Sequence, residues 1–501
     1  MKNKTGVCRA LLLVGMGLMI PCYLFTAGNT LLSPWPLYDR NRLALCLLTP
    51  LCLLLLLLLG RAAKAKVFET HERAVLLGFA AFYFVIQLVM ASALRFTPVT
   101  DLEQCVTAAR RLAQTGAFGN SERSLIYFGR YPHNMGLVYL LAGIFKAADA
   151  LGADELMAAA LVCGLLFSMG LLCAARLCRR LGGAQVQARA LLLFATCLPF
   201  LYCTSELYTD AFSVAFAPMI VFAFLKARDA GSRKERSLWA LLFAVCTFFG
   251  AQIRFPTIIA AIACLIAALF EKRAKLTALL AALLALVFAV GGSAVNAANK
   301  ANLGAANIAQ NKLPKLHYIA MGLPVQSDEG YGQYGYGGWL IFSTSFDDPQ
   351  ARDEALRQEV VDRAYTLAHH PAQLLSTLSR KNLSTFGRGT FNLNEIFEAD
   401  AHEADNAVKQ AVFENGRFNR AYTHLATAMF VAQMALACIA CIQAIRRRDT
   451  RAAPLFLTLL GAFLFLSIWE TRARYFFQFM MILLCAGAMF ETPSTHAAQK
   501  A

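Results

Sequence analysis

The feature that most constrains this chain is a series of long apolar runs, each close to the length of a membrane-crossing helix. A helix needs about 20 mostly apolar residues to cross a hydrocarbon layer about 30 Å thick. Of the 501 residues, 58% are hydrophobic and only 16% are charged, so apolar segments dominate the sequence. We therefore expect an all-α polytopic membrane protein.

Counting runs of this length predicts about 12 transmembrane helices. Their expected ranges are 10–27, 43–60, 74–94, 155–177, 188–203, 211–225, 238–250, 257–270, 276–295, 421–445, 454–469 and 475–490. Residues 135–148 are also apolar but shorter, and we expect them to form a helix that lies at the membrane interface. If this segment crossed, Arg176, Arg179 and Arg180 would fall on the exterior side, away from the other basic loops.

The net charge of +16 comes largely from short basic loops between the apolar runs. The positive-inside rule places such loops in the cytoplasm, and nucleic acid is therefore not an expected partner. Basic residues collect at 61–73, 226–236, 271–275 and 446–451. This pattern predicts a multi-pass protein of the cell membrane, surrounded by membrane lipids, with both termini in the cytoplasm.

The first apolar run follows Lys2, Lys4 and Arg9, as the apolar region of a signal peptide does. We expect a retained anchor instead, because a second run follows at once and no convincing small-residue cleavage site separates the two. The 15 cysteines lie mostly inside apolar runs and predict no disulfide framework.

These assignments divide the chain into four parts. Residues 1–73 hold two additional N-terminal helices, and residues 74–296 form a transmembrane core whose first exterior loop is 95–152. Residues 297–420 form a large exterior segment of mixed structure, and residues 421–501 hold the C-terminal helices. The exterior segment contains a Gly/Tyr run, which suits turns that present aromatic rings to a sugar, although interfacial tyrosines explain it equally well.

The first exterior loop carries a carboxylate pair, Asp101 and Glu103. Thr100-Asp101-Leu102-Glu103 has the spacing of a capping box, and an amphipathic helix closed by Gly116 follows. Helix capping alone explains the pair, yet its position just outside the bilayer, among other polar residues, favours a functional site. The polar residues that follow are Tyr127, Arg130, Tyr131, His133 and Asn134.

Ionisable residues also lie at the exterior ends of later spans. Desolvation makes such charges costly, so function is their default explanation, with interfacial snorkelling of the arginines as the alternative. These residues are Glu206 and Asp210 in TSELYTD, Arg254 in AQIRFP, and Glu470, Arg472 and Arg474 in WETRARYF.

With the span layout, these motifs resemble the GT-C superfamily of membrane glycosyltransferases, particularly the protein O-mannosyltransferase and lipid A aminoarabinose-transferase type. Asp101-Leu102-Glu103 is similar to the acidic motif of the family's first exterior loop. Asp210 resembles a later acidic residue, and Arg254 before Phe255-Pro256 resembles a basic exterior turn. TSELYTD lacks the Arg-Pro that commonly precedes that acid, the first two spans are additional, and segment 297–420 has no counterpart in the family layout.

The resemblance implies an enzyme that moves a sugar from a polyprenyl-phosphate donor to a glycan, lipid or protein acceptor on the exterior face. Attack at the anomeric carbon requires a general base, for which Asp101 is the candidate, with Glu103 as a second catalytic carboxylate. The departing lipid phosphate requires a cation, for which Arg254 is the first candidate. The expected substrate-binding residues are Tyr131, His133, Asn134, Glu206, Asp210, Arg254, Arg472 and Arg474.

A metal and two other classes of protein stay open at this point. Asp101 and Glu103 are compatible with a Mg²⁺ or Mn²⁺ ion but do not establish one. A secondary transporter or lipid-linked sugar flippase would have a similar number of spans, but the sequence shows no repeated halves. A polysaccharide polymerase or ligase would also fit, with a polyprenyl pyrophosphate donor in place of the monophosphate.

Overall fold

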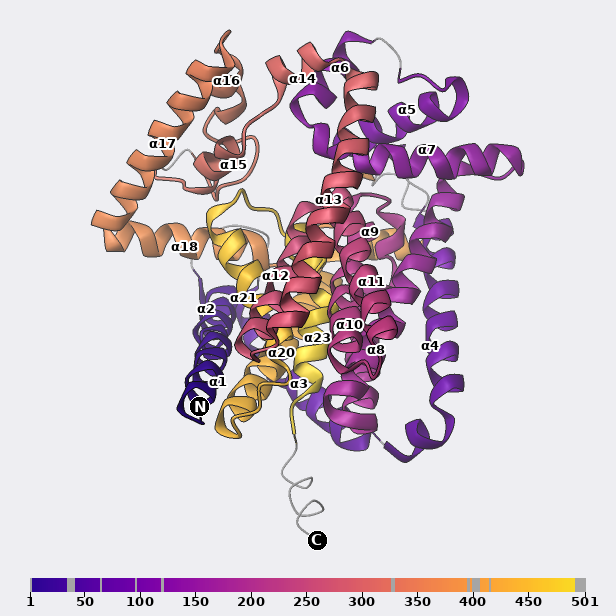
Figure 1. Cartoon of the computed structure of the whole chain (residues 1–501), viewed down its shortest axis with the longest axis vertical. Helices are drawn as coiled ribbons and strands as arrows, with labels where there is room; N and C mark the ends of the chain where they lie inside the picture. The colour runs from indigo at the N-terminus through magenta and orange to yellow at the C-terminus, as the bar shows by residue number, and fades with distance from the viewer. Residues whose placement is uncertain are drawn as a thin grey trace.

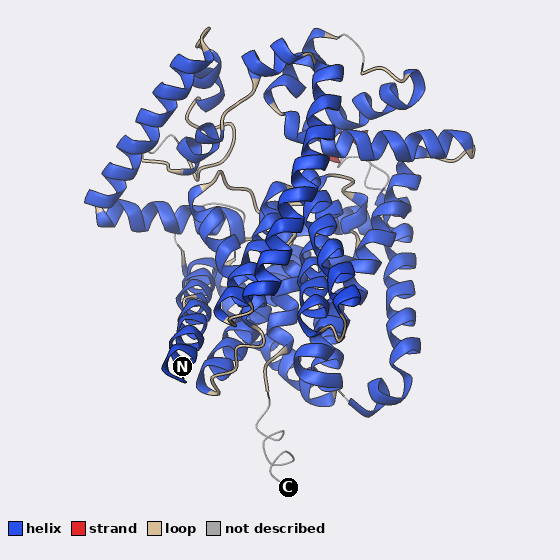
Figure 2. Cartoon of the chain, in the orientation of Figure 1, coloured by secondary structure: helices blue, strands red, loops and turns tan. Residues whose placement is uncertain are grey.

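The computed structural model describes residues 2–33, 41–63, 65–94, 97–118, 121–325, 329–393, 397–398, 406–413 and 416–491. Helices make up most of these residues (Figure 2), which confirms the predicted all-α class. Two strands of two residues each, β1 (Thr97–Pro98) and β2 (Phe397–Glu398), pair antiparallel with Thr97 opposite Glu398. This pairing joins the first predicted exterior loop to the large segment that precedes the last helices.

A bundle of long apolar helices fills the lower part of Figure 1. Its elements are α1 (Lys2–Gly17), α2 (Met19–Leu32), α3 (Arg42–Ala62), α4 (Ala65–Leu94), α8 (Glu155–Ala195), α9 (Thr209–Ser213), α10 (Phe216–Asp229), α11 (Arg233–Ile253), α12 (Ile258–Phe270), α13 (Ala274–Leu303), α20 (Asn419–Arg446), α21 (Ala453–Ile468), α22 (Arg474–Phe477) and α23 (Met480–Ala488). Among the described residues, 8 helices are long and apolar enough to cross a membrane, and the apolar helices Phe255–Phe270 and Ala453–Ile468 are shorter. Several passes are thus supported, whereas the predicted number of about 12 stays a prediction.

The outer surface of the bundle suits lipid rather than water. In α3, Leu47, Leu51 and Leu58 are more than half exposed, whereas Leu45 and Leu56 are buried against the bundle. The exposed leucines recur at helical spacing, so they form a continuous apolar stripe. A stripe of this kind would be unfavourable in water and is the expected surface of a helix in a bilayer.

Helix α8 is a helical hairpin rather than one straight rod. Its backbone leaves the helical region at Gly182 and Gly183, and Gly183 has a φ of 77°, which glycine adopts without strain. After this turn the chain runs back, so that Arg179 Nη1 donates to Gln187 Oε1 at 3.2 Å. The predicted spans 155–177 and 188–203 correspond to the two arms, but the second arm ends at Ala195. Pro199 lies in the 3₁₀ turn Leu198–Leu201 that follows, where a missing N–H is tolerated.

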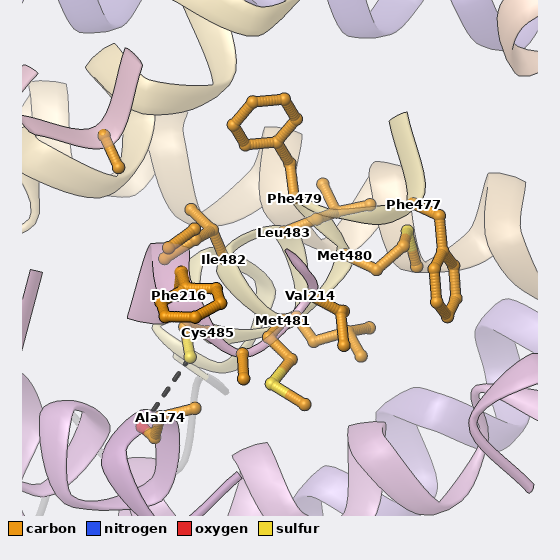
Figure 3. Packing of buried hydrophobic residues seen from close by; sticks show 14 of the residues in the cluster. Ala174, Val214, Phe216, Phe477, Phe479, Met480, Met481, Ile482, Leu483 and Cys485 are labelled. Atoms are coloured by element: carbon orange, nitrogen blue, oxygen red, sulfur yellow. Dashed lines mark hydrogen bonds between the residues drawn. The ribbon is translucent and has the colours of Figure 1, made fainter. Parts of the chain in front are cut away.

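The last predicted span, 475–490, is broken at Gln478 into α22 and α23. Gln478 explains the position of the break, because its side chain accepts a hydrogen bond from Thr257 Oγ1 at 3.1 Å and donates one to the Tyr475 carbonyl. Every residue of α23 is buried, and Figure 3 shows its residues Met481, Ile482 and Cys485 close to Ala174 of α8 and Phe216 of α10. A helix that is apolar on all sides belongs at the centre of such a bundle.

Three helices, α5 (Thr100–Thr115), α6 (Glu122–Arg130) and α7 (Met135–Ala150), lie over one end of the bundle. Helix α7 runs across the ends of α4 and α8 in Figure 1, as expected for the interfacial segment 135–148. The predicted capping box of α5 is wrong, because Thr100 is already the first helical residue and the cap, Val99, makes no side-chain hydrogen bond. Thr100 instead has a φ of 51°, which is strained for a β-branched residue. The predicted apolar face and the Gly116 end of α5 are confirmed.

The large segment 297–420 is mainly helical where it is described, rather than mixed. It begins within α13, which continues past the predicted span end at residue 295 to Leu303. The following helices are α14 (Ala305–Asn311), α15 (Lys315–Gly322), α16 (Trp339–Thr344), α17 (Pro349–His369), α18 (Pro371–Phe386) and α19 (Ala407–Val412). Helix α14 packs on α6, so the large segment meets segment 95–152 above the bundle.

Candidate functional site

A cavity of about 1140 Å³ lies where one end of the bundle meets α5, α6 and the chain from α13 to α15. Pockets that bind drug-sized ligands usually measure about 300–1,000 Å³. This cavity is therefore large enough to hold more than one small ligand. The predicted site residues that line it are Asp101, Glu103, Tyr131, His133, Asn134, Arg254, Arg472 and Arg474.

Asp101 is held by two tyrosines, one from α6 and one that directly precedes α9. Tyr127 Oη donates to Asp101 Oδ1 at 2.7 Å, and Tyr208 Oη lies 3.5 Å from Asp101 Oδ2. Asn134 Nδ2 in turn donates to Tyr127 Oη at 3.0 Å, which fixes the direction of that hydroxyl. Burial raises the pKa of Tyr127 well above its ordinary value, so the phenol stays protonated and donates. Asp101 is thus an oriented, partly exposed carboxylate, whereas Glu103 is an exposed one.

Tyr131 and His133 lie in the cavity wall beside Asp101. The Tyr131 and Tyr334 hydroxyls are 3.2 Å apart, so the Gly/Tyr run of the large segment reaches segment 95–152. The His133 ring opens to the cavity. Desolvation by the surrounding walls lowers the pKa of His133 to about 4, and the charges of Arg254 and Lys312 add to the decrease, while Asp101 opposes it. The imidazole is therefore neutral at pH 7.

Asp210 joins two arginines that are far apart in the sequence. Its Oδ1 lies 2.9 Å from Arg254 Nε, and its Oδ2 lies 3.3 Å from Arg474 Nε. The Asp210 side chain is fully buried and does not line the cavity, whereas both arginines do. The trio carries one net positive charge, which the arginines present to the cavity.

Aromatic rings and a hydroxyl fix both guanidinium groups in place. Arg254 Cζ lies 4.3 Å from the ring centroid of Tyr475, and Arg254 Nη1 donates to Thr209 Oγ1 at 2.7 Å. Arg474 Cζ lies 5.5 Å from the ring centroid of Tyr208. Planar guanidinium groups held in this way suit the recognition of phosphate or carboxylate.

Glu206 lies deeper than its predicted role as a substrate ligand implies. It is 1% exposed and does not line the cavity. Burial, reinforced by the nearby Asp210 charge, raises the pKa of Glu206 well above its ordinary value, which favours the protonated form of this carboxyl. The adjacent Leu207 has a φ of 49°, and the backbone is therefore strained beside the buried acids.

Arg472 connects the last helices to the large segment. Arg472 Nη2 donates to the Tyr334 carbonyl at 3.2 Å, and Thr471 N donates to the Gly332 carbonyl at 2.8 Å. Gly332 has a φ of 76°, a conformation that favours glycine. Nearby, Tyr475 Oη donates to Glu470, and burial raises the pKa of the Glu470 carboxyl.

The sequence analysis missed several residues that line the cavity. Their positions depend on chain segments that meet only in the fold, and isolated lysines or aromatic residues in loops carry no spacing signal. Tyr208 was identifiable only by its place in TSELYTD, between the two acids. Other cavity residues without a predicted role include Lys312, Lys315, Tyr318, Trp469 and Tyr475.

The described residues give no ligand set for a Mg²⁺ or Mn²⁺ ion, which the sequence left open. Across the described ranges, no group of three or more His, Cys, Asp or Glu side chains is placed to hold a metal. Asp101 and Glu103 alone offer two carboxylates, and the Tyr127 hydroxyl already donates to Asp101. A metal bound here would need ligands from a substrate or water.

Fold and surface together define a multi-pass integral membrane protein with a polar cavity at one end of its helix bundle. Residues 41–495 match a family described as conserved hypothetical integral membrane protein, and the chain belongs to that family. No curated protein and no solved structure matches the chain.

Proposed function

We propose that this protein is a GT-C-like membrane glycosyltransferase that moves a sugar from a polyprenyl-phosphate donor to an acceptor hydroxyl. The observation that carries the proposal is that one cavity holds both an oriented carboxylate and a paired-arginine group. Tyr208 connects them, because its hydroxyl is close to Asp101 and its ring lies beside the Arg474 guanidinium.

In the proposed reaction, Asp101 accepts the proton of the acceptor hydroxyl as that oxygen attacks the anomeric carbon. The bond between the anomeric carbon and the phosphate oxygen breaks, and the lipid phosphate leaves with the electron pair. Positioned general bases typically contribute about 10²–10⁴-fold in rate. Attack from the face opposite the phosphate inverts the configuration at that carbon.

Arg254 and Arg474 would bind the departing phosphate, because charge develops on its oxygens in a site with little water. Asp210 holds the two guanidinium groups in one place and lowers their mutual repulsion. Its role in this proposal is positioning, since its buried carboxylate has no path to the substrate. Tyr131, His133 and Asn134 would bind sugar hydroxyls through neutral hydrogen-bonding groups.

The orientation of the protein is part of the proposal. The basic loops at 226–236 and 446–451 mark the cytoplasmic face, which puts the cavity on the exterior face. If the two arms of α8 each cross, and if α12, α21 and the broken α22–α23 segment also cross, the chain makes the predicted number of about 12 passes.

Cleavage of the donor distinguishes this function from transport. The purified protein in lipid nanodiscs, given a radiolabelled polyprenyl-phosphate sugar and a mixed glycan acceptor fraction, is expected to release free polyprenyl phosphate and label the acceptor. A transporter or flippase would instead move the intact donor across vesicles and leave its sugar–phosphate bond unbroken. Donor movement without bond cleavage would reject the transferase.

A further inference from the structure

We propose that Arg130, Lys312 and Lys315 form a second anion-binding subsite of the cavity, which takes a phosphate or carboxylate group carried by the acceptor. The assignment to the acceptor rests on the proposed function, because a glycosyl transfer is what places an acceptor in this cavity. The existence of the subsite rests on the arrangement of charges alone.

The three cations come together through a contact between two separate chain segments. Arg130 is the last residue of α6, Lys312 follows α14, and Lys315 begins α15. The amide of Leu313 donates to the Arg130 carbonyl at 3.3 Å, which joins the end of α6 to the chain between Lys312 and Lys315. All three side chains line the cavity.

These cations differ from the first arginine pair because no acid neutralises them. Arg254 and Arg474 both pair with Asp210. By contrast, Arg130, Lys312 and Lys315 make no ion pair with any residue in the described part of the chain. Three like charges on one wall repel one another, and an anion placed between them would relieve that repulsion.

The Nε atom of Arg130 provides a second indication that a ligand binds here. This atom is buried and has no hydrogen-bond partner among the described residues. A position at the C-terminal end of α6 explains a positive charge there, because it complements the helix dipole. It does not explain a buried donor without an acceptor, which is unfavourable unless a ligand supplies one.

The second subsite lies on the aqueous side of the proposed donor phosphate site. Its residues lie at the end of α6, directly after α14 and at the start of α15, and these helices stand outside the apolar bundle. By contrast, Arg254 directly follows α11 and Arg474 begins α22, and both helices belong to the bundle. The neutral His133 ring lines the same cavity and is within electrostatic reach of both Arg254 and Lys312. A ligand in the outer subsite therefore approaches Asp101 from the side opposite the bundle.

Binding of inorganic pyrophosphate tests the subsite without any turnover. Calorimetric titration would use the full chain in phosphatidylcholine nanodiscs and compare wild type with the Lys312→Gln/Lys315→Gln double variant. We expect this variant to lose about tenfold or more in affinity at one site. The matched control is Lys300→Gln, which removes an exposed lysine of α13 that does not line the cavity. Pyrophosphate affinity equal to wild type in the double variant would overturn the proposal.

A second binding experiment distinguishes this subsite from the proposed donor phosphate site. Arg254→Gln is expected to weaken one pyrophosphate site and leave the lysine-dependent site intact. If only the lysine variant changes binding, the subsite stands and the donor phosphate site fails. Adding phosphatidylglycerol to the nanodiscs distinguishes the two possible sources of the anion. If the lipid competes with pyrophosphate for the lysine-dependent site, a lipid headgroup is the source; if it does not compete, the source is a water-soluble anion.

Discussion

The Asp210 carboxylate lies 2.9 Å from Arg254 Nε and is fully buried. This contact joins α9, which contains Asp210, to the turn between α11 and α12. Because Arg474 pairs with the other carboxylate oxygen, one acidic side chain organises three distant segments around the cavity.

Replacing Asp210 with Asn should therefore damage stability more than it damages chemistry directly. The variant leaves two neighbouring guanidinium groups without their shared carboxylate, and breaking a buried ion pair typically costs about 3–5 kcal/mol. Thermal or denaturant unfolding in detergent measures the loss. The control is Asp229→Asn, whose carboxylate is 35% exposed and pairs with Arg180 and Arg228, so its loss should cost less than about 1 kcal/mol. Equal losses in the two variants would contradict the organising role of Asp210.

Asp101→Asn should reduce transfer by about 10²–10⁴-fold while the protein still binds the donor, because the amide accepts no proton. Turnover and donor binding are measured separately on the same preparation. Glu103→Gln is the matched control on the same helical turn, and a smaller effect is expected because no tyrosine orients Glu103. Near-normal turnover in a folded Asp101→Asn protein would remove Asp101 from the base role.

Much of the fold follows from sequence patterns with a direct physical cause. Apolar runs predict the bundle, and the amphipathic face and Gly116 predict the extent of α5. The sequence does not show that Gly182 and Gly183 turn α8 into a hairpin, or that Gln478 breaks the last span, because both depend on packing against distant helices. The predicted N-cap of α5 was wrong, because Thr100 has a positive φ and an N-cap residue needs an extended backbone.

The candidate site, like the fold, is predictable from the sequence only in part. Ionisable residues at span ends indicate which side chains to examine, because charges near a bilayer are rare. They do not indicate that Asp210 faces the arginines rather than the cavity, or that Lys312 and Lys315 join the wall. Those facts arise from contacts between segments that are separated in the sequence and meet only in the fold.

His133 should not contribute to the pH dependence of activity between about pH 5 and 8. Its pKa is lowered to about 4, so the imidazole stays neutral across that interval. Because the native state binds this proton less than the unfolded state does, stability should rise with pH between about 4 and 6.5 and change little above it. His133→Gln should keep the shape of the activity profile in this range. Loss of a pH-dependent limb near pH 6 in the variant would contradict the neutral assignment.

Lys381 of α18 should make stability depend on pH at a higher range. It is 1% exposed, it donates to the Trp469 carbonyl at 2.6 Å and to the Gly322 carbonyl, and burial lowers its pKa to about 7, although Glu470 opposes the decrease. Between about 7 and the ordinary value of 10.5, the unfolded chain binds this proton and the native state does not. Stability should therefore rise with pH in that window. Melting temperatures from about pH 6 to 9 test this, and Lys381→Gln should flatten the rise; an unchanged slope would disprove it.

Cysteine labelling tests the orientation independently of chemistry. A cysteine at Ser121, the cap of α6, should react with a membrane-impermeant reagent on intact cells. Ser232 is the cap of α11, a helix of 21 residues whose opposite end is followed by Arg254 at the cavity. A cysteine at Ser232 should therefore react only after permeabilisation. The reverse pattern would place the cavity in the cytoplasm.

A cryo-EM map of the protein with a bound polyprenyl-phosphate sugar tests the central claim most directly. The account predicts phosphate density beside Arg254 and Arg474, with the anomeric carbon turned towards the Asp101 carboxylate. A donor held at mid-depth in the bundle, with Asp101 directed away from its sugar, would contradict the account and favour a transporter.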